Sequence, residues 1–293
     1  MEPRAYGPYP YEPIVDRPPL VWPGGARIAF WAIPNIEVFA LDERMPDGPG
    51  LIPDVSAWGR RDYGNRVGVF RMMEVMERHG VRGTVALNSE VCDAAPRIVE
   101  ECLRLGWELM GHCESNTRRL NEAGSEAAAG RIVARTLERI ERATGRRPTG
   151  WLGAGRQETW GTLDRLVAEG CRYVVDWDSD DQPVLMEVAG GTIVSMPYGA
   201  GVSDKQAFEG SGFSADDFER MIRRAFDVLY AESAVSGRVA SVSLHPYIIG
   251  VPHRIGALDR ALAHIGSHDG VWLATGEEIV AHFLEWKAGQ GAG

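Results

Sequence analysis

Short apolar runs alternate with segments of helical periodicity along most of the 293-residue chain, and this alternation constrains the fold more than any other feature. The runs that predict strands are residues 27–33, 83–87, 107–110, 149–152, 173–175, 192–196, 239–244 and 271–274. The segments that predict helices are residues 67–79, 95–105, 127–144, 162–169, 216–233, 255–265 and a last helix beginning at Thr275. Such alternation favours parallel strands joined by crossover helices, closed as a barrel or left as a doubly wound sheet. Seven or eight units in about 270 residues fit one (β/α) barrel.

The first 25 residues differ from the rest of the chain because they are rich in proline, which blocks helices and sheet ladders. We divide the chain into an extended N-terminal arm, residues 1–25, and a single catalytic barrel domain, residues 26–293. An arm of this kind commonly lies on its own domain or on a neighbouring subunit. The arm shows no basic start followed by an apolar run and a cleavage site, so we expect a cytoplasmic protein.

Charge and composition exclude several classes of protein. Apolar residues make up 44% of the chain and charged residues 25%, which is ordinary globular composition. The formal net charge of −10 disfavours general binding to nucleic acid or to anionic membranes. No run approaches the roughly 20 apolar residues that span a bilayer. The four cysteines lack CxxC spacing, which argues against a disulfide scaffold or a cysteine-rich zinc site.

Candidate site residues follow seven of the eight predicted strands, at the end where barrel active sites lie. Loops are polar in any case, so each position also has a plain structural interpretation. The candidates are Asn35 and Glu37, Asn88 and Glu90, His112 and Asn116, Gly155 and Arg156, the acidic run from Asp176 to Asp181, Tyr198, and His245. Of the seven histidines, only His112 and His245 directly follow a strand. Within the acidic run we favour Asp180 and Asp181.

Two arginines carry a further hypothesis, because a guanidinium fork suits a carboxylate or a carbonyl. Arg66 lies near the start of the helix predicted at 67–79, and Arg156 follows the fourth strand. A surface role is an equal alternative for each. Cys113 adjoins His112, but a nucleophilic cysteine needs a base and an electropositive setting, so we do not expect it to react. The chain contains no GxGxxG, P-loop, GxSxG or HExxH motif.

The order of these strand ends resembles the polysaccharide deacetylase superfamily. Its usual pattern is a double Asp, a later His-x-x-x-His, an Arg-Pro-Pro-like turn and a late Leu-His. The chain has Asn-Ile-Glu-Val at 35–38, His-Cys-Glu-Ser-Asn at 112–116, Gly-Trp-Leu-Gly at 150–153 and Ser-Leu-His at 243–245. The resemblance implies an α/β fold, a distorted (β/α) barrel of about seven parallel strands.

Within that superfamily the chain is more similar to the branch of cofactor-independent allantoinases and cyclic imide hydrolases. The stretches that carry this likeness are 22–29 (WPGGARIA), 63–69 (YGNRVGV), 180–181, 197–198 and 226–232 (FDVLYAE). The likeness covers nearly the whole chain and leaves the substrate open. Together with the proline-rich arm, it implies a homo-oligomer.

The departures from the deacetylase pattern concern the metal. The resemblance places zinc ligands at Val38, His112 and Asn116. Valine cannot ligate a metal, and an amide oxygen is a weak zinc ligand beside imidazole. We therefore expect no tightly held metal and no cofactor.

The resemblance also assigns roles to the remaining groups. Glu37 stands at the general base position, acting alone or with His112, and His245 at the general acid position. Backbone N–H groups near residues 153–156, or Asn88, would hold the oxyanion. The expected substrate-binding residues are Arg66, Asn88, Glu90, Asn116, Gly155, Arg156, Asp181 and Tyr198.

Without a Lewis acid, such a site favours an activated carbonyl. We predict hydrolytic opening of a cyclic C–N bond in a small-molecule cyclic amide, meaning an imide, a hydantoin or a ureide such as allantoin. The alternatives are a zinc-dependent N-deacetylase of an acetylated sugar and a non-catalytic relative that binds a ligand.

Overall fold

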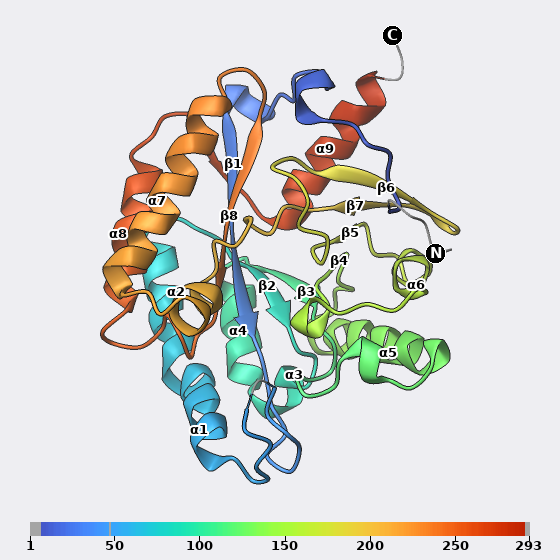
Figure 1. Ribbon diagram of the computed structural model, residues 1–293, viewed down its shortest axis with the longest axis vertical. Coiled ribbons are helices and arrows are strands. Elements are labelled where there is room, and N and C mark those ends of the chain that lie inside the picture. Colours follow the sequence, from blue (N-terminus) through green and yellow to red (C-terminus); the bar gives the residue numbers. More distant parts are fainter. Residues whose placement is uncertain (1–6, 47, 291–293) are drawn as a thin grey trace.

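A single curled sheet organises the molecule, which is described from a computed structural model at residues 7–46 and 48–290. Within those residues nine strands join in the order β6-β7-β5-β4-β3-β2-β1-β8, with β9 also paired to β1. All neighbours are parallel except β6 and β7, which form an antiparallel pair. The sheet is therefore an open, distorted barrel (Figure 1), whose two end strands are β6 and β8.

The strand bounds follow the apolar runs of the sequence closely. The strands are β1 (Ile28–Ile36), β2 (Thr84–Leu87), β3 (Glu108–Gly111), β4 (Gly150–Trp151), β5 (Tyr173–Val174), β6 (Val184–Val188), β7 (Gly191–Ser195), β8 (Arg238–Leu244) and β9 (Val271–Leu273).

Helices cover the outer side of the curled sheet. They are α1 (Val55–Tyr63), α2 (Val69–Arg78), α3 (Val91–Ala94), α4 (Pro96–Arg104), α5 (Glu126–Thr144), α6 (Thr162–Ala168), α7 (Ala215–Glu232), α8 (Ile255–Gly266) and α9 (Gly276–Gln290). In Figure 1, α7, α8 and α2 lie on one side of β1, while α5 and α6 lie on the other.

The predicted barrel is confirmed, with two differences in its parts. The alternation suggested only parallel strands, but β6 runs antiparallel to β7 and forms a hairpin with it. The strand was missed because β6 is only partly buried and follows Pro183. Between the strand predicted at 27–33 and the helix predicted at 67–79, the structure contains one more helix, α1, which begins at Val55 and is capped by the Asp54 side chain.

Strand β1 is the centre of the core because it pairs with β2, β8 and β9. All nine of its residues are buried. Ile28 and Phe30 face the cluster beneath α2, α7 and α8, whereas Ala29 and Trp31 face the interior of the barrel. A strand buried on both faces reads as a continuous apolar run, which explains the sequence of this segment.

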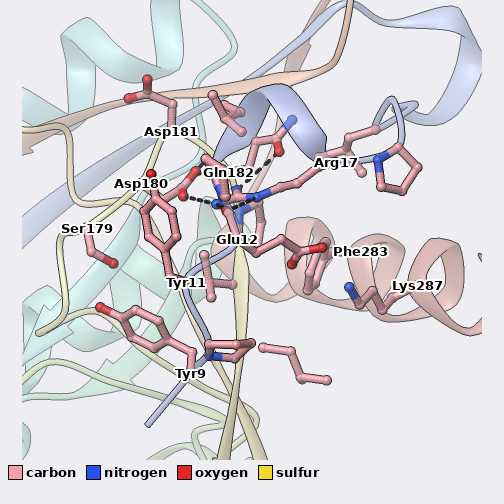
Figure 2. Close-up of a pocket in the computed structure, with 18 of the residues that line it drawn as sticks. Tyr9, Tyr11, Glu12, Arg17, Ser179, Asp180, Asp181, Gln182, Phe283 and Lys287 are labelled. Atoms are coloured by element: carbon pink, nitrogen blue, oxygen red, sulfur yellow. Dashed lines mark hydrogen bonds and ion pairs between the residues drawn. The ribbon is translucent and has the colours of Figure 1, made fainter. Parts of the chain in front are cut away.

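The described residues of the arm, 7–25, lie against the barrel. Trp22 is 1% exposed, and the Gly237 N–H donates to the Leu20 carbonyl oxygen at 2.8 Å. The Arg17 guanidinium pairs with the Asp180 carboxylate at 2.6 Å, as Figure 2 shows. A groove of about 670 Å³ lies between the arm, β6 and α9. Residues 1–6 of the predicted arm, and residues 47 and 291–293 of the predicted barrel domain, lie outside the described residues.

No helix within the described residues combines the length and the apolarity needed to cross a membrane.

Candidate active site

The register of the sheet brings the predicted catalytic residues together. Ile36 pairs with Leu87, and Leu87 pairs with Gly111, so Glu37 and His112 each follow their strands at the same level. On the other side of β1, β8 ends at Leu244, directly before His245. All three side chains line one cavity of about 500 Å³ at the carboxyl ends of the strands. This is the end at which barrel active sites form.

The Glu37 carboxylate is the centre of this cluster. Its Oε1 accepts a hydrogen bond from Asn116 Nδ2 at 2.8 Å. The same oxygen lies 3.4 Å from His112 Nε2 and 4.0 Å from His245 Nε2. Its Oε2 accepts a hydrogen bond from the Tyr247 hydroxyl at 3.4 Å. Four side chains, two from the segment after β3 and two from the segment after β8, therefore converge on one buried carboxylate.

These contacts determine the charge of Glu37. Burial disfavours the carboxylate, but the hydrogen bond from His112 and the charge of His245 outweigh it and hold the pKa of Glu37 below its ordinary value. Glu37 is therefore ionised at neutral pH, which is the state a general base requires.

His112 has a fixed orientation. Its Nδ1 lies 2.7 Å from the Leu152 carbonyl oxygen, which can only accept, so the Nδ1 proton is donated there. The ring consequently turns Nε2 toward Glu37. The peptide chain around it is held by Asn88, whose Nδ2 donates to the His112 carbonyl and whose Oδ1 accepts from the Val38 N–H. Asn88 is buried and joins two loops, so its amide is not free to bind an oxyanion or a substrate.

His245 is clamped by Asp204, a residue that the sequence analysis missed. Asp204 Oδ1 lies 2.7 Å from His245 Nδ1, and its Oδ2 accepts the His245 backbone N–H at 2.6 Å. Burial alone would lower the pKa of His245, but the Asp204 carboxylate outweighs it and raises that pKa above its ordinary value. The imidazolium is thus favoured, with Nε2 directed at Glu37, as a general acid requires.

The stretch at 63–69 (YGNRVGV) also contributes to the site, but through Asn65 and Gly68 and not through the predicted Arg66. Asn65 Nδ2 donates to the Glu37 carbonyl oxygen at 2.8 Å. A Cβ at Gly68 would lie 2.2 Å from the Pro246 carbonyl oxygen, so only glycine allows this turn to pack on the segment after His245. The stretch thus holds the segments that follow β1 and β8 together.

The opposite wall of the cavity carries charge. Arg156 has a positive φ of 55° and lies 3.4 Å from Asp178 Oδ2 and 5.6 Å from the centroid of the Tyr198 ring. The Tyr198 hydroxyl, 2.5 Å from Ser243 Oγ, links this wall to β8. Gly155, Arg119 and Lys205 also line the cavity. The predicted substrate-binding residues Asn116, Gly155, Arg156 and Tyr198 are therefore brought together.

The structure does not bring two other predicted binding residues, Arg66 and Glu90, into the cavity. Arg66 points outward with 74% of its side chain exposed and pairs with Asp62. Glu90 pairs with Arg118 at 2.9 Å outside the cavity.

In the acidic run 176–181, the residue that lines the cavity is not one of the two that we favoured, Asp180 and Asp181. Asp180 anchors the arm through Arg17, and Asp181 lies at the edge of the arm groove (Figure 2). Asp178 is the member that reaches the cavity. Asp176 accepts the Gly153 N–H at 2.8 Å, which removes that donor from the predicted oxyanion site.

Cys113 is buried and its φ is 58°. Burial raises the pKa of its thiol to about 12, so the thiol stays protonated and unreactive.

Comparison with known proteins agrees with this geometry. No protein-family model matches the chain. It is 26% identical over 278 residues to a Schizosaccharomyces pombe protein named "Putative polysaccharide deacetylase", covering 87% of this chain and 85% of that one. The crystal structure of a "probable Polysaccharide deacetylase" from Pseudomonas aeruginosa PAO1 superposes with a TM-score of 0.83 at 27% identity, covering 92% of this chain and 95% of that chain. In sequence and in fold, this chain is similar to proteins of the polysaccharide deacetylase superfamily.

Within the superfamily, the crystal structure of Puue allantoinase is about equally similar. It superposes with a TM-score of 0.82 at 26% identity, over 92% of this chain and 94% of that chain. The chain is thus related to hydrolases that act on carbon–nitrogen bonds.

The superfamily implies a zinc ion, and the side chains at its ligand positions do not fit one. Val38 offers no donor atom, and Asn116 is tied to Glu37 through its amide nitrogen. Only His112 Nε2 is a strong zinc ligand there. Among the described residues, one group of three possible metal ligands does occur, namely Asp227, His264 and His268. It is partly exposed on α7 and beside α8, outside the catalytic cavity.

Proposed function

We propose that this protein is a metal-independent hydrolase that opens a cyclic C–N bond in an imide, a hydantoin or a ureide. The observation that carries the proposal is that Glu37 faces His245 across 4.0 Å, with the pKa of Glu37 lowered and that of His245 raised, at a site whose zinc-ligand positions do not fit zinc. The similarity to Puue allantoinase supports it.

The reaction follows from the positions of these groups. Glu37 takes a proton from water as the water oxygen attacks the ring carbonyl carbon. The tetrahedral oxyanion collapses, the ring C–N bond breaks, and His245 Nε2 gives its proton to the departing nitrogen. The product is an open-chain amide or urea with a new carboxylic acid, which ionises. His245 regains a proton from Glu37, and the site is restored. General acid and base assistance each contribute roughly 10²–10⁴-fold to such a step.

Asn116 supplies a means of recognising the ring. Its Nδ2 is committed to Glu37, while its buried Oδ1 has no hydrogen-bond partner among the described residues. A buried acceptor without a partner is costly, so a ligand donor that fills the position gains affinity. The N–H of a cyclic imide or ureide is such a donor, and it lies next to the carbonyl that water must attack.

A carboxylate base without a metal is a weak catalyst of amide hydrolysis, so we expect the site to act on cyclic substrates and not on acetamides. Without a metal to polarise the carbonyl, the site relies on a substrate whose carbonyl is already electrophilic and whose nitrogen leaves readily. Ring imides and ureides have both properties, whereas an N-acetyl sugar has neither.

The proposal is tested by a hydrolysis screen with the purified chain. Succinimide, hydantoin, allantoin and N-acetylglucosamine oligomers are each incubated with the wild type and with Glu37→Gln. We expect turnover of at least one ring compound by the wild type and its loss in the variant. Turnover of the acetylated sugar alone would favour the deacetylase alternative, and binding of a ring without turnover would favour the non-catalytic alternative.

A further inference from the structure

The catalytic cavity gathers cationic side chains in a protein whose formal net charge is −10. Arg119, Arg156 and Lys205 all line it. The carboxylates of Glu37 and Asp178 line the same cavity, so the question is which of the three cations lacks an acidic partner. A cyclic imide or hydantoin core is neutral, so ring hydrolysis alone does not explain a cation that has no such partner.

Two of these cations have acidic partners, and the third has none. Arg156 faces Asp178 at 3.4 Å, and Lys205 faces Glu209 at 3.7 Å. The Arg119 guanidinium makes no hydrogen bond or ion pair with any residue that the structure describes, although the residue is only partly exposed. The next residue in sequence, Arg118, pairs with both Glu43 and Glu90 outside the cavity. The unpaired charge is therefore specific to the arginine that faces the site.

The backbone at 153–156 is shaped to accommodate the Arg119 guanidinium. Gly155 has a φ of +66°, and a Cβ placed there would lie 3.1 Å from both Cζ and Nε of Arg119. The guanidinium thus lies against the bare Cα of Gly155, at the wall of the cavity. The next residue, Arg156, is also left-handed, with a φ of 55°. The left-handed conformation costs little at Gly155 but is strained at Arg156, and strained non-glycine residues of this kind cluster at ligand sites.

We infer that Arg119, with Arg156 beside the same loop, forms a subsite for a carboxylate on the substrate. The inference rests on the proposed function and names its substrate class: a cyclic imide or ureide that bears an anionic substituent. A guanidinium fork matches a carboxylate through two parallel hydrogen bonds. Glu37, His112 and His245 act on the ring, while Arg119 holds the substituent and so fixes which carbonyl faces the catalytic pair.

A pair of isosteres tests the charge requirement directly. Hydantoin-5-acetate carries the carboxylate, and hydantoin-5-acetamide replaces it by a neutral group of the same shape. We expect the wild type to favour the acetate by about 10- to 100-fold in kcat/KM, the range for a hydrogen-bonded charged group. Arg119→Gln reduces this preference to near unity, and Arg119→Lys restores part of it. Arg118→Gln is the matched control, and it keeps the wild-type preference.

Calorimetric titration separates this inference from the proposed reaction. Should no ring compound be hydrolysed, the dissociation constant of hydantoin-5-acetate is measured for the wild type and for Arg119→Gln. Binding that weakens tenfold or more in the variant upholds the carboxylate subsite even though the proposed reaction has failed. A preference for the acetate that persists in Arg119→Gln overturns the inference while leaving ring hydrolysis intact. Equal binding of acetate and acetamide, or binding of neither, by the wild type also overturns it.

Ring opening itself creates a carboxylate, and Arg119 could bind this product group instead of a substituent on the substrate. Succinamate and succinamide, titrated into the wild type and Arg119→Gln, distinguish it from a substituent. Selective loss of succinamate binding in the variant, with no loss of the preference for hydantoin-5-acetate, would assign Arg119 to the product and overturn the substrate assignment.

Discussion

Glu37 Oε1 and His245 Nε2 lie 4.0 Å apart, although 208 residues separate them in the sequence. The contact arises because β1 and β8 are parallel neighbours in register, with Pro34 opposite Leu244. A carboxylate that prefers to be ionised therefore faces an imidazole that prefers to hold its proton. Pairs of titratable groups whose environments move their pKa values apart are typical of acid–base catalysis.

Glu37→Gln tests the base. The amide keeps the shape of the side chain but cannot accept the proton of water, so kcat/KM for a ring substrate should fall by about 10²–10⁴-fold. Glu43→Gln is the matched control, because Glu43 pairs with Arg118 outside the cavity and should change kcat/KM by less than about threefold. Steady-state kinetics measure both, and equal activities of Glu37→Gln and the wild type would remove Glu37 from the chemistry.

Asp204→Asn tests the positioning of the acid. In the wild type the profile of kcat/KM against pH should rise with ionisation of Glu37 below pH 4.5 and fall with deprotonation of His245 above pH 6.5, since the first pKa is lowered and the second raised. Replacing the Asp204 carboxylate removes the charge that stabilises the imidazolium, so the alkaline limb should move to lower pH. Histidine NMR titration provides an independent measurement. An alkaline limb that does not move would show that Asp204 does not set the pKa of His245.

A pair of glycine substitutions tests the support beneath the site. A Cβ at Gly68 would meet the Pro246 carbonyl oxygen at 2.2 Å, so Gly68→Ala should lower the free energy of unfolding by about 1–3 kcal/mol. Gly59 lies in α1 with open space around its Cα, so Gly59→Ala should raise that free energy by about 0.5–1 kcal/mol. Urea unfolding measures both, and the same sign of change in the two variants would contradict the packing described.

The sequence alone predicts the parts of this molecule that depend on local pattern. Three features follow from residue type and spacing: the buried strand β1, the helices α7 and α9, and the polar residues at the ends of β1, β3 and β8. The strand β6 could not be predicted in this way, because a half-exposed edge strand lacks a strong apolar signal.

Two residues of the site, Asp204 and Asn65, were not predicted from the sequence for a different reason. Asp204 meets His245 across 41 residues, and Asn65 meets Glu37 across 28 residues. Neither residue directly follows a strand, because Asn65 lies in the helical segment Gly64–Gly68 and Asp204 lies in the helical turn that leads into Gln206–Gly210. The path of the folded chain therefore decides which polar residue reaches the cavity. Likewise, only the folded chain shows that Arg119 and Asp178 line the cavity, whereas their neighbours in sequence, Arg118 and Asp181, do not.

The central claim, that Glu37 and His245 cleave the ring without zinc, is tested most directly by one measurement. The wild type is dialysed against a strong chelator, its metal content is determined, and kcat/KM for the best ring substrate is measured with and without added Zn²⁺. The account predicts full activity in metal-free protein and no gain on adding zinc. Activity that disappears with the metal and returns in proportion to bound zinc would contradict it.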